Sequence, residues 1–553
     1  MFRKALTIVI LSLLVIAPTS FAEVTHVHNV KGYTMSSDGK LVTFTNMIVE
    51  DGKVANIGGE ALGHAFPTAQ QFDGNGNTLL PGLIDAHGHL LGLGASLLEV
   101  DVRAATSAED AAKKVAEYYR SHDELSWVTG GGWNQVLWPD KQFPSAATLD
   151  EGVKDVPVWL ERVDGHAGWA NSKALQLAGI TRDSVAPEGG KILKDSNGEP
   201  TGVLIDTAMF LVSELIPTQD EAILNQRLNE AGAHLLSLGV TSMHDAGIDK
   251  QTYDFYQALA ANEQLPVRVY GMLSAIDPSL PDMLKAGHIK TQDDMLLIRS
   301  VKAYGDGALG SRGAALLQPY SDDPHNHGLL VTPQEQLPDL FKRVISNNFA
   351  LHFHAIGDRA NQLALDHFES TFEQVGGQDL RHRIEHAQVI DVNDIPRFKS
   401  LNIIPSMQPT HATSDKNMAE DRVGKERLKG AYAWRTFLEQ GSPLAFGSDF
   451  PVELANPFYG LHAAVTRQDR DNQPVAGWVP EQALTIQEAF RAFTIDAAYA
   501  ADQDKQLGSL EAGKWADFIL IDQDIFAIDA KDIWKTNVIK TFIAGQEVYS
   551  ESQ

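Results

Sequence analysis

Short apolar segments alternate with longer amphipathic segments through the middle of the chain. Residues 225–239 and 335–348 are typical of the amphipathic segments. This alternation is typical of βα units, and eight units predict an α/β fold built on a (β/α)8 TIM barrel. A doubly wound open sheet is the competing arrangement. The eight apolar segments are residues 79–87, 240–245, 266–273, 298–307, 350–358, 383–390, 403–409 and 443–449.

Both ends of the chain have a different pattern, with shorter alternating runs broken by turn residues. The tripeptide DGK occurs twice between residues 23 and 80, and residues 505–553 have a similar pattern. Such runs predict β-hairpins. We expect residues 23–80 and 505–553 to pair as one composite β-sandwich domain beside a barrel at 81–504.

The gap between the first two strand segments is too long for a single crossover. Residues from about 95 to 232 therefore predict an insertion after the first barrel strand. The catalytic end of a TIM barrel is the C-terminal end of its strands. An insertion that leaves the barrel there would cover the site as a lid.

Residues 1–22 have the pattern of a secretory signal peptide. Arg3 and Lys4 precede an apolar run, and Ser20 and Ala22 provide the small residues of a cleavage site. We expect Sec-type export to the periplasm or medium, with no membrane anchor after cleavage. An uncleaved anchor is the alternative, although a span needs about 20 apolar residues.

Composition narrows the range of partners. The formal net charge is −27, which argues against nucleic acid and anionic membranes as partners, although acidity also serves solubility. The chain has no cysteine, so the fold depends on its core without disulfides. An edge of the predicted sandwich could pair two copies as a homodimer.

Side chains that can bind a metal ion lie at or near the C-terminal ends of most of the strand segments. Imidazole suits zinc and other late divalent ions, and carboxylate suits harder ones. Each residue alone is weak evidence, but side chains at the same end of successive strands should converge. The predicted ligands are His87, His89, Lys302, His354, His386 and Asp449.

Lys302 is the unusual member of this set because an ammonium group repels cations. Its neutral amine could add carbon dioxide and become an anionic carbamate that bridges two metal ions. An ordinary ion pair between Lys302 and Asp306 is the alternative. Other hydrolase signatures are missing: there is no Cys nucleophile, G-x-S-x-G elbow, H-E-x-x-H helix or P-loop.

Several motifs follow one another along the chain. They are PGLIDAHGH, VKAYGDGALGSR, HAIGDRA, RIEHAQ, QPTHATSD and GSDFPV, with DGHAGWANSKAL and GEPTGVLID in the insertion and GSLEAGKWADFILID near the C-terminus. Their order resembles the amidohydrolase superfamily, and specifically amidohydrolase family 3, which includes N-substituted formamide deformylases. The resemblance covers essentially the whole chain after the predicted signal peptide.

The resemblance implies one or two divalent ions, zinc before iron, manganese or nickel. His87 and His89 would hold one ion, His354 and His386 the other, and carbamylated Lys302 would bridge them. Asp449 would act as general base and then acid, and His386 could support the oxyanion. His352, on the same face as His354, is expected to lie behind the ligands.

The implied reaction is hydrolysis of a small-molecule amide, with metal-activated hydroxide attacking a non-peptide carbon–nitrogen bond of an N-formyl or N-acyl group. A non-enzymatic periplasmic binding or regulatory protein on the same scaffold is the alternative. Tryptophans of the insertion could instead only pack it on the barrel. The predicted substrate contacts are Trp133, His166, Arg312 and Gln408.

Overall fold

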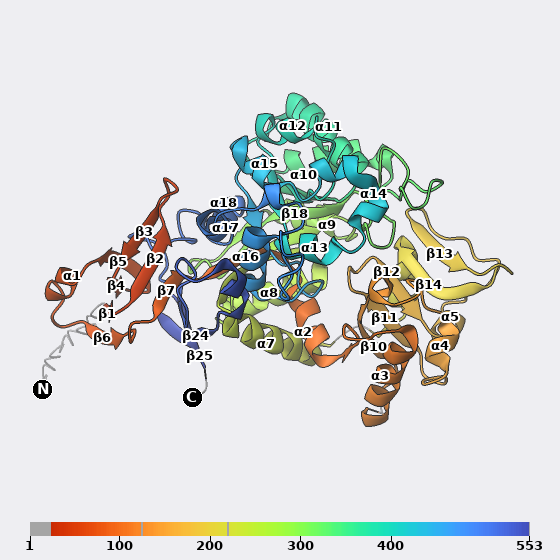
Figure 1. Ribbon diagram of the computed structural model, residues 1–553, viewed down its shortest axis with the longest axis horizontal. Helices are drawn as coiled ribbons and strands as arrows, with labels where there is room; N and C mark the ends of the chain where they lie inside the picture. The colour runs from red at the N-terminus through yellow and green to blue at the C-terminus, as the bar shows by residue number, and fades with distance from the viewer. Residues whose placement is uncertain (1–23, 123–124, 218–219, 552–553) are drawn as a thin grey trace, which may run out of the picture.

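The computed structural model describes residues 24–122, 125–217 and 220–551. The predicted signal peptide lies outside the described residues. No helix within the described ranges is long and apolar enough to cross a bilayer. Figure 1 shows three regions in a row: the strands from both chain ends, a central barrel, and a separate β-rich insertion.

A parallel sheet of eight strands, adjacent in chain order, forms the centre of the molecule. Backbone hydrogen bonds from Asp449 N to His87 O (2.7 Å) and from His89 N to Phe450 O (2.8 Å) join its two outer strands. The sheet is therefore a nearly closed barrel, and the predicted TIM barrel is confirmed. The strands are β8 (Leu83–Gly88), β15 (Val240–Ile248), β16 (Arg268–Ser274), β18 (Leu296–Tyr304), β19 (Ala350–Ala355), β20 (Arg383–His386), β21 (Ile404–Met407) and β22 (Ala445–Phe446).

Helices on the outside of the barrel each bury one apolar stripe, as their sequence pattern predicts. Helix α10 (Leu337–Ser346) places Phe341 against Phe353 of β19 and Phe368 of α11 (Asp358–Val375), with ring centroids 5.1 and 4.8 Å apart. These contacts fix the helix layer on the strands, so the strand ends have a rigid support.

The two chain ends share one sheet, with strand order β25-β24-β23-β7-β2-β3. Phe518 and Phe542 stack in its core with centroids 4.2 Å apart. A second sheet, β5-β4-β1-β6, packs against it. The strands are β1 (Val24–His28), β2 (Lys31–Met35), β3 (Leu41–Phe44), β4 (Asn46–Glu50), β5 (Lys53–Gly58), β6 (Gln70–Asp73), β7 (Thr78–Pro81), β23 (Phe518–Ile521), β24 (Val538–Ile543) and β25 (Gln546–Ser550).

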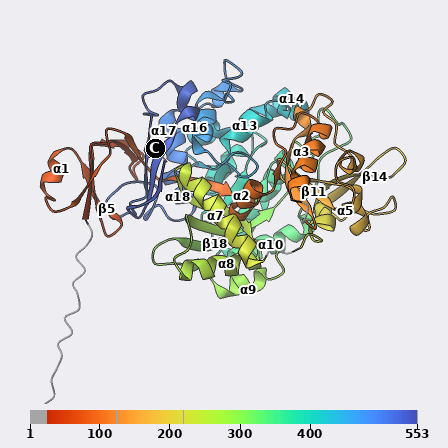
Figure 2. The same ribbon diagram turned by 90° about the horizontal axis from the view of Figure 1, so that it is seen from below.

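The insertion has its own sheet and core. It leaves the barrel through α2 (Leu90–Leu98) and returns through α7 (Glu221–Ser237), and Figure 2, seen from below, shows these two helices side by side. The sheet order is β13-β14-β12-β11-β10-β9. Its strands are β9 (Val100–Asp101), β10 (Val128–Trp133), β11 (Val158–Arg162), β12 (Ala167–Ala170), β13 (Gly190–Lys194) and β14 (Pro200–Asp206).

Candidate metal centre

Strand β8 ends in two imidazoles that face the open end of the barrel. His87 is buried, and His89 precedes α2 with a side chain that is 35% exposed. Their ring centroids are 5.8 Å apart and nearly perpendicular. Lys302 of β18 brings its Nζ to 3.2 Å from His87 Nε2. Burial lowers the pKa of Lys302, which favours the neutral amine.

Asp449 lies between two pairs of imidazoles. Its backbone has a positive φ of 63°, which turns the chain sharply just after β22. Oδ1 is 3.3 Å from His89 Nε2 and 3.6 Å from His87 Nε2. Oδ2 is 3.7 Å from His411 Nε2 and 3.9 Å from His386 Nδ1. Burial opposes ionisation, but the neighbouring charges of His87 and His89 hold the pKa of Asp449 well below its usual range.

His354 and His386 complete the centre from β19 and β20. Their ring centroids are 4.5 Å apart, and His386 is 4.9 Å from His87. Burial lowers the pKa of both His354 and His386 well below the usual range, so both rings are neutral. Neutral imidazole is the form that binds metal.

Asp306 does not pair with Lys302 in the described part of the chain. Its carboxylate instead accepts backbone N–H groups from Ala315 (2.7 Å), Ile356 (3.0 Å) and Gly357 (2.8 Å). Burial raises the pKa of Asp306 to about 7 despite these bonds. The ion-pair alternative for Lys302 therefore has no support in the geometry.

A buried polar layer lies directly behind the centre. Glu385 Oε2 accepts a hydrogen bond from His87 Nδ1 at 2.5 Å, which directs His87 Nε2 into the site. Glu385 Oε1 is 3.7 Å from His352 Nδ1 and 3.8 Å from Arg383. Arg383 in turn donates to His244 at 3.0 Å. Carboxylates that hold a metal-binding histidine in this way fix its tautomer.

The donor set fits a divalent metal ion. Two groups of side chains, His87–His89–Asp449 and His386–His411–Asp449, each place their ligand atoms within 4.8 Å of one another. His354 Nε2 and His411 Nε2 are buried and have no hydrogen-bond partner among the described residues. Buried polar atoms are normally paired, so these nitrogens point to a ligand that the protein itself does not provide.

The insertion contributes His166 to the same centre. Its ring centroid is 5.1 Å from that of His354, and its Nδ1 is 2.7 Å from Asp206 Oδ1. Burial opposes protonation, but the hydrogen bond and charge of Asp206, with Asp164 and Asp306 nearby, raise the pKa of His166. The insertion therefore places a polar side chain beside His354, near the C-terminal end of β19.

The other predicted substrate contacts lie in different surroundings. Trp133 is fully buried in the insertion's own core and donates to Leu160 O at 2.9 Å, so it packs within the insertion and not on the barrel. Gln408 accepts from His386 Nδ1 at 2.9 Å and thereby orients that ring. Arg312 pairs with Asp322 at 3.0 Å, and its side chain is partly exposed.

Two residues of the centre were not among the predicted site residues. His411 lies in α13 (Pro409–Asp415), directly after β21, and Glu385 precedes His386 in β20. Both belong to motifs that carry the resemblance, QPTHATSD and RIEHAQ. Their position within those motifs could have identified both residues. The spacing of residues along the chain alone does not show where either side chain points.

Comparison with known proteins agrees with this architecture. Protein LONG AFTER FAR-RED 3 of Arabidopsis thaliana is 33% identical over 539 residues, 94% of this chain and 90% of its own length. N-substituted formamide deformylase of Arthrobacter pascens is 26% identical over 518 residues, covering 90% and 94%. An uncharacterized metal-dependent hydrolase from Pyrococcus horikoshii OT3 superposes with a TM-score of 0.74 and 28% identity, over 92% of this chain and 99% of that chain.

The same assignment follows from a family model. The model described as "Amidohydrolase family" matches residues 70–549, which include the barrel, the insertion and the C-terminal strands. The resemblance carried by the sequence motifs is thereby confirmed. This protein belongs to the amidohydrolase family.

Proposed function

We propose that this protein is a metal-dependent hydrolase of small-molecule amides and cleaves a non-peptide carbon–nitrogen bond of an N-formyl or N-acyl group. The observation that carries the proposal is Asp449 placed between two pairs of imidazoles at the open end of the barrel. The similarity to a formamide deformylase and to a metal-dependent hydrolase supports the reaction class.

A divalent ion at this centre would act as a Lewis acid that polarises the substrate carbonyl and lowers the pKa of water, so that water can attack near neutral pH. His87 and His89 would hold it with Asp449. Zinc suits imidazole and carboxylate donors well, and iron, manganese and nickel accept the same set.

The chain's own groups would then move the proton. Asp449 is held ionised by its neighbours, so it can accept a proton from the attacking water. It would then pass that proton to the departing amine nitrogen, as a general base that becomes a general acid. His386, oriented by Gln408, would face the developing oxyanion.

Lys302 would add negative charge if its amine became a carbamate. The nitrogen would bond to the carbon of carbon dioxide and release one proton. Its buried position beside His87 and its lowered pKa support this modification. Added bicarbonate would then raise metal retention and activity together.

The test is a substrate screen on metal-replete protein that begins after residue 22. N-formyl, N-acyl and cyclic amides would be assayed with and without bicarbonate. Asp449→Asn should lower kcat by about 10²–10⁴-fold because the proton acceptor is removed. His367→Ala, at a partly buried histidine on α11 outside the centre, is the matched control and should retain full rate.

Two results would contradict the proposal. One is full activity of Asp449→Asn on a substrate that the parent protein hydrolyses. The other is the absence of turnover on every amide class by a protein that retains its metal, which would favour a binding or regulatory role on this scaffold.

A further inference from the structure

Arg467 is a buried cation without a carboxylate partner. Three arginine side chains within the described ranges are less than 2% exposed, those of Arg268, Arg383 and Arg467. Arg268 binds Asp517 at 2.6 Å, and Arg383 lies 3.8 Å from Glu385. Arg467 instead donates to backbone carbonyl groups and forms no ion pair with any described residue. Buried charges are usually paired, because a charge that loses its water of hydration is costly unless an opposite charge replaces it.

The position of Arg467 is set where α16 (Pro457–Thr466) ends. Its backbone is left-handed, with a φ of 57°, and the chain then folds back so that Trp478 N donates to Arg467 O at 2.8 Å. Nε of Arg467 donates to Trp478 O at 2.7 Å, and Nη1 donates to Tyr432 O at 3.2 Å. A guanidinium group carries five N–H bonds. Nη2 is buried and has no hydrogen-bond partner among the described residues, so both of its N–H groups are unpaired.

Two indole rings lie against this guanidinium. Its Cζ is 4.2 Å from the ring centre of Trp434 and 5.4 Å from that of Trp478. The ring faces attract the cation, but they do not replace an anion as acceptors for Nη2. Trp434 is the first residue of α15 (Trp434–Glu439) and is fully buried, and its Nε1 also has no hydrogen-bond partner in the described part of the chain. Two unpaired donors therefore belong to side chains that touch.

The guanidinium of Arg467 stays charged at neutral pH. Burial lowers the pKa of Arg467 to about 9, although Tyr432 and Glu481 oppose this shift. Glu481 is exposed to solvent, so it does not take the place of a buried counter-charge. A water molecule would satisfy the unpaired donors and leave the charge unbalanced. An anion would do both.

We propose that Arg467 and Trp434 bind a small monovalent anion such as chloride, between the end of α16 and the start of α15. Arg467 Nη2 and Trp434 Nε1 would both donate to it. One negative charge matches the single unbalanced cation, whereas a dianion would leave a buried negative charge in its turn. The bound anion would tie the segment after α16 to α15. This site is separate from the metal centre and does not depend on the proposed reaction.

Unfolding in urea at constant ionic strength tests the site, with gluconate replaced stepwise by chloride. A ligand that binds one site of the folded chain lowers the unfolding constant by the factor 1 + [L]/Kd, so a tenfold rise in chloride well above Kd should lower it about tenfold. Arg467→Met should abolish this dependence. Arg397→Met is the matched control and should retain it, because Arg397 is a partly exposed arginine paired with Asp394 and Glu369.

A second variant separates anion binding from a folding defect. Trp434→Phe keeps a ring face over the guanidinium and removes the N–H donor. The Kd for chloride should rise about tenfold or more, as expected for a lost hydrogen bond to a charged group. That Kd is read from the chloride dependence and not from the absolute stability of the variant. Crystals of the parent protein grown in bromide should show an anomalous difference peak in contact with Arg467 Nη2 and Trp434 Nε1.

Several results would overturn the inference. They are an unfolding constant of the parent that does not respond to chloride, an equal response in Arg467→Met, and an unchanged Kd in Trp434→Phe. Density beside Arg467 Nη2 without an anomalous signal would identify a water molecule and reject the anion. If Arg467→Met does not fold, the bromide crystals and the Kd of Trp434→Phe decide the question.

Discussion

The two ends of the barrel are both polar, but they differ in how their charges are paired. At the C-terminal end, Asp449 faces four imidazoles at 3.3–3.9 Å, and His411 Nε2 has no hydrogen-bond partner within the described chain. At the N-terminal end, Arg268 binds both oxygens of Asp517, at 2.6 and 3.0 Å. A buried ion pair is thus closed at the N-terminal end, whereas His411 Nε2 at the C-terminal end has no hydrogen-bond partner among the described residues.

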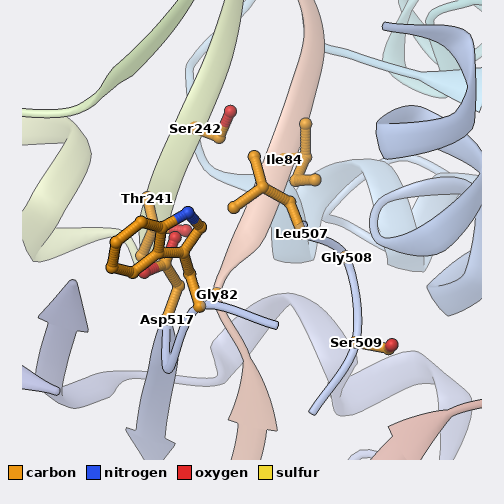
Figure 3. A pocket seen from close by; sticks show the side chains of 9 residues that line it. Gly82, Ile84, Thr241, Ser242, Leu507, Gly508, Ser509 and Asp517 are labelled. Carbon is orange, nitrogen blue, oxygen red and sulfur yellow. The ribbon is translucent and has the colours of Figure 1, made fainter. Parts of the chain in front are cut away.

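The N-terminal end also joins the barrel to the composite domain. Asp517 precedes β23 and additionally accepts from Ala544 N at 2.8 Å, while Trp515 lies 5.0 Å from the Arg268 guanidinium. A small cavity of about 10 Å³ lies there, lined in part by Gly82, Thr241 and Asp517 (Figure 3). Stability and chemistry are thus assigned to opposite ends of the same strands.

Substitution of Asp517 gives the largest effect expected from the comparison. Asp517→Asn would leave the buried Arg268 charge without its partner, which typically costs about 3–5 kcal/mol. We expect the free energy of unfolding in urea to fall by that amount. Metal content and kcat per folded molecule should not change, because Asp517 lies at the far end from Asp449. A loss of bound metal at unchanged stability would contradict the separation of stability and chemistry between the two ends of the barrel.

A substitution of Glu385 tests the C-terminal end of the barrel, and its expected effect is smaller than that of Asp517→Asn. Glu385→Gln would weaken the hydrogen bond that orients His87, and such changes usually lower metal affinity about 10–100-fold. The Kd for Zn²⁺, measured by competition with a chelator, should rise accordingly. Glu488→Gln is the matched control, because it alters a partly exposed ion pair with Arg435 and should leave the Kd unchanged. An equal rise of the Zn²⁺ Kd in both variants would contradict the role of Glu385 in orienting His87.

Much of the fold could be predicted because burial on both faces makes barrel strands continuous apolar runs. Strand β8 is an example: all six of its residues are buried, and five of them, 83–87, lie within the apolar segment 79–87. The order of the motifs then identified the family. The motif with His87 and His89 at the end of one strand is followed, farther along the chain, by the motif with Asp449 at the end of another. The barrel, the shared terminal sheet and the insertion follow from that pattern and are confirmed.

The details of the centre could not be predicted because local backbone turns redirect side chains. In a regular strand Glu385 and His386 would point to opposite faces. His386 has a φ of 72° and Ala387 a φ of 44°, so the chain turns and both Glu385 and His386 contact the centre. His411 similarly depends on where α13 begins after β21. The alternation of apolar and polar residues along the chain carries no information about either turn.

The smallest expected effect concerns the cavity at the N-terminal end. Thr241 Oγ1 is buried beside it and has no hydrogen-bond partner among the described residues, so Thr241→Val removes a polar group that gives little to the folded state. Replacing a polar atom by an apolar one of similar shape is nearly neutral, and we expect a change in unfolding free energy below about 1 kcal/mol. Urea denaturation and the Zn²⁺ Kd would be measured together. A loss of metal affinity in Thr241→Val would contradict this separation, because it would show that a substitution at the N-terminal end reaches the metal centre.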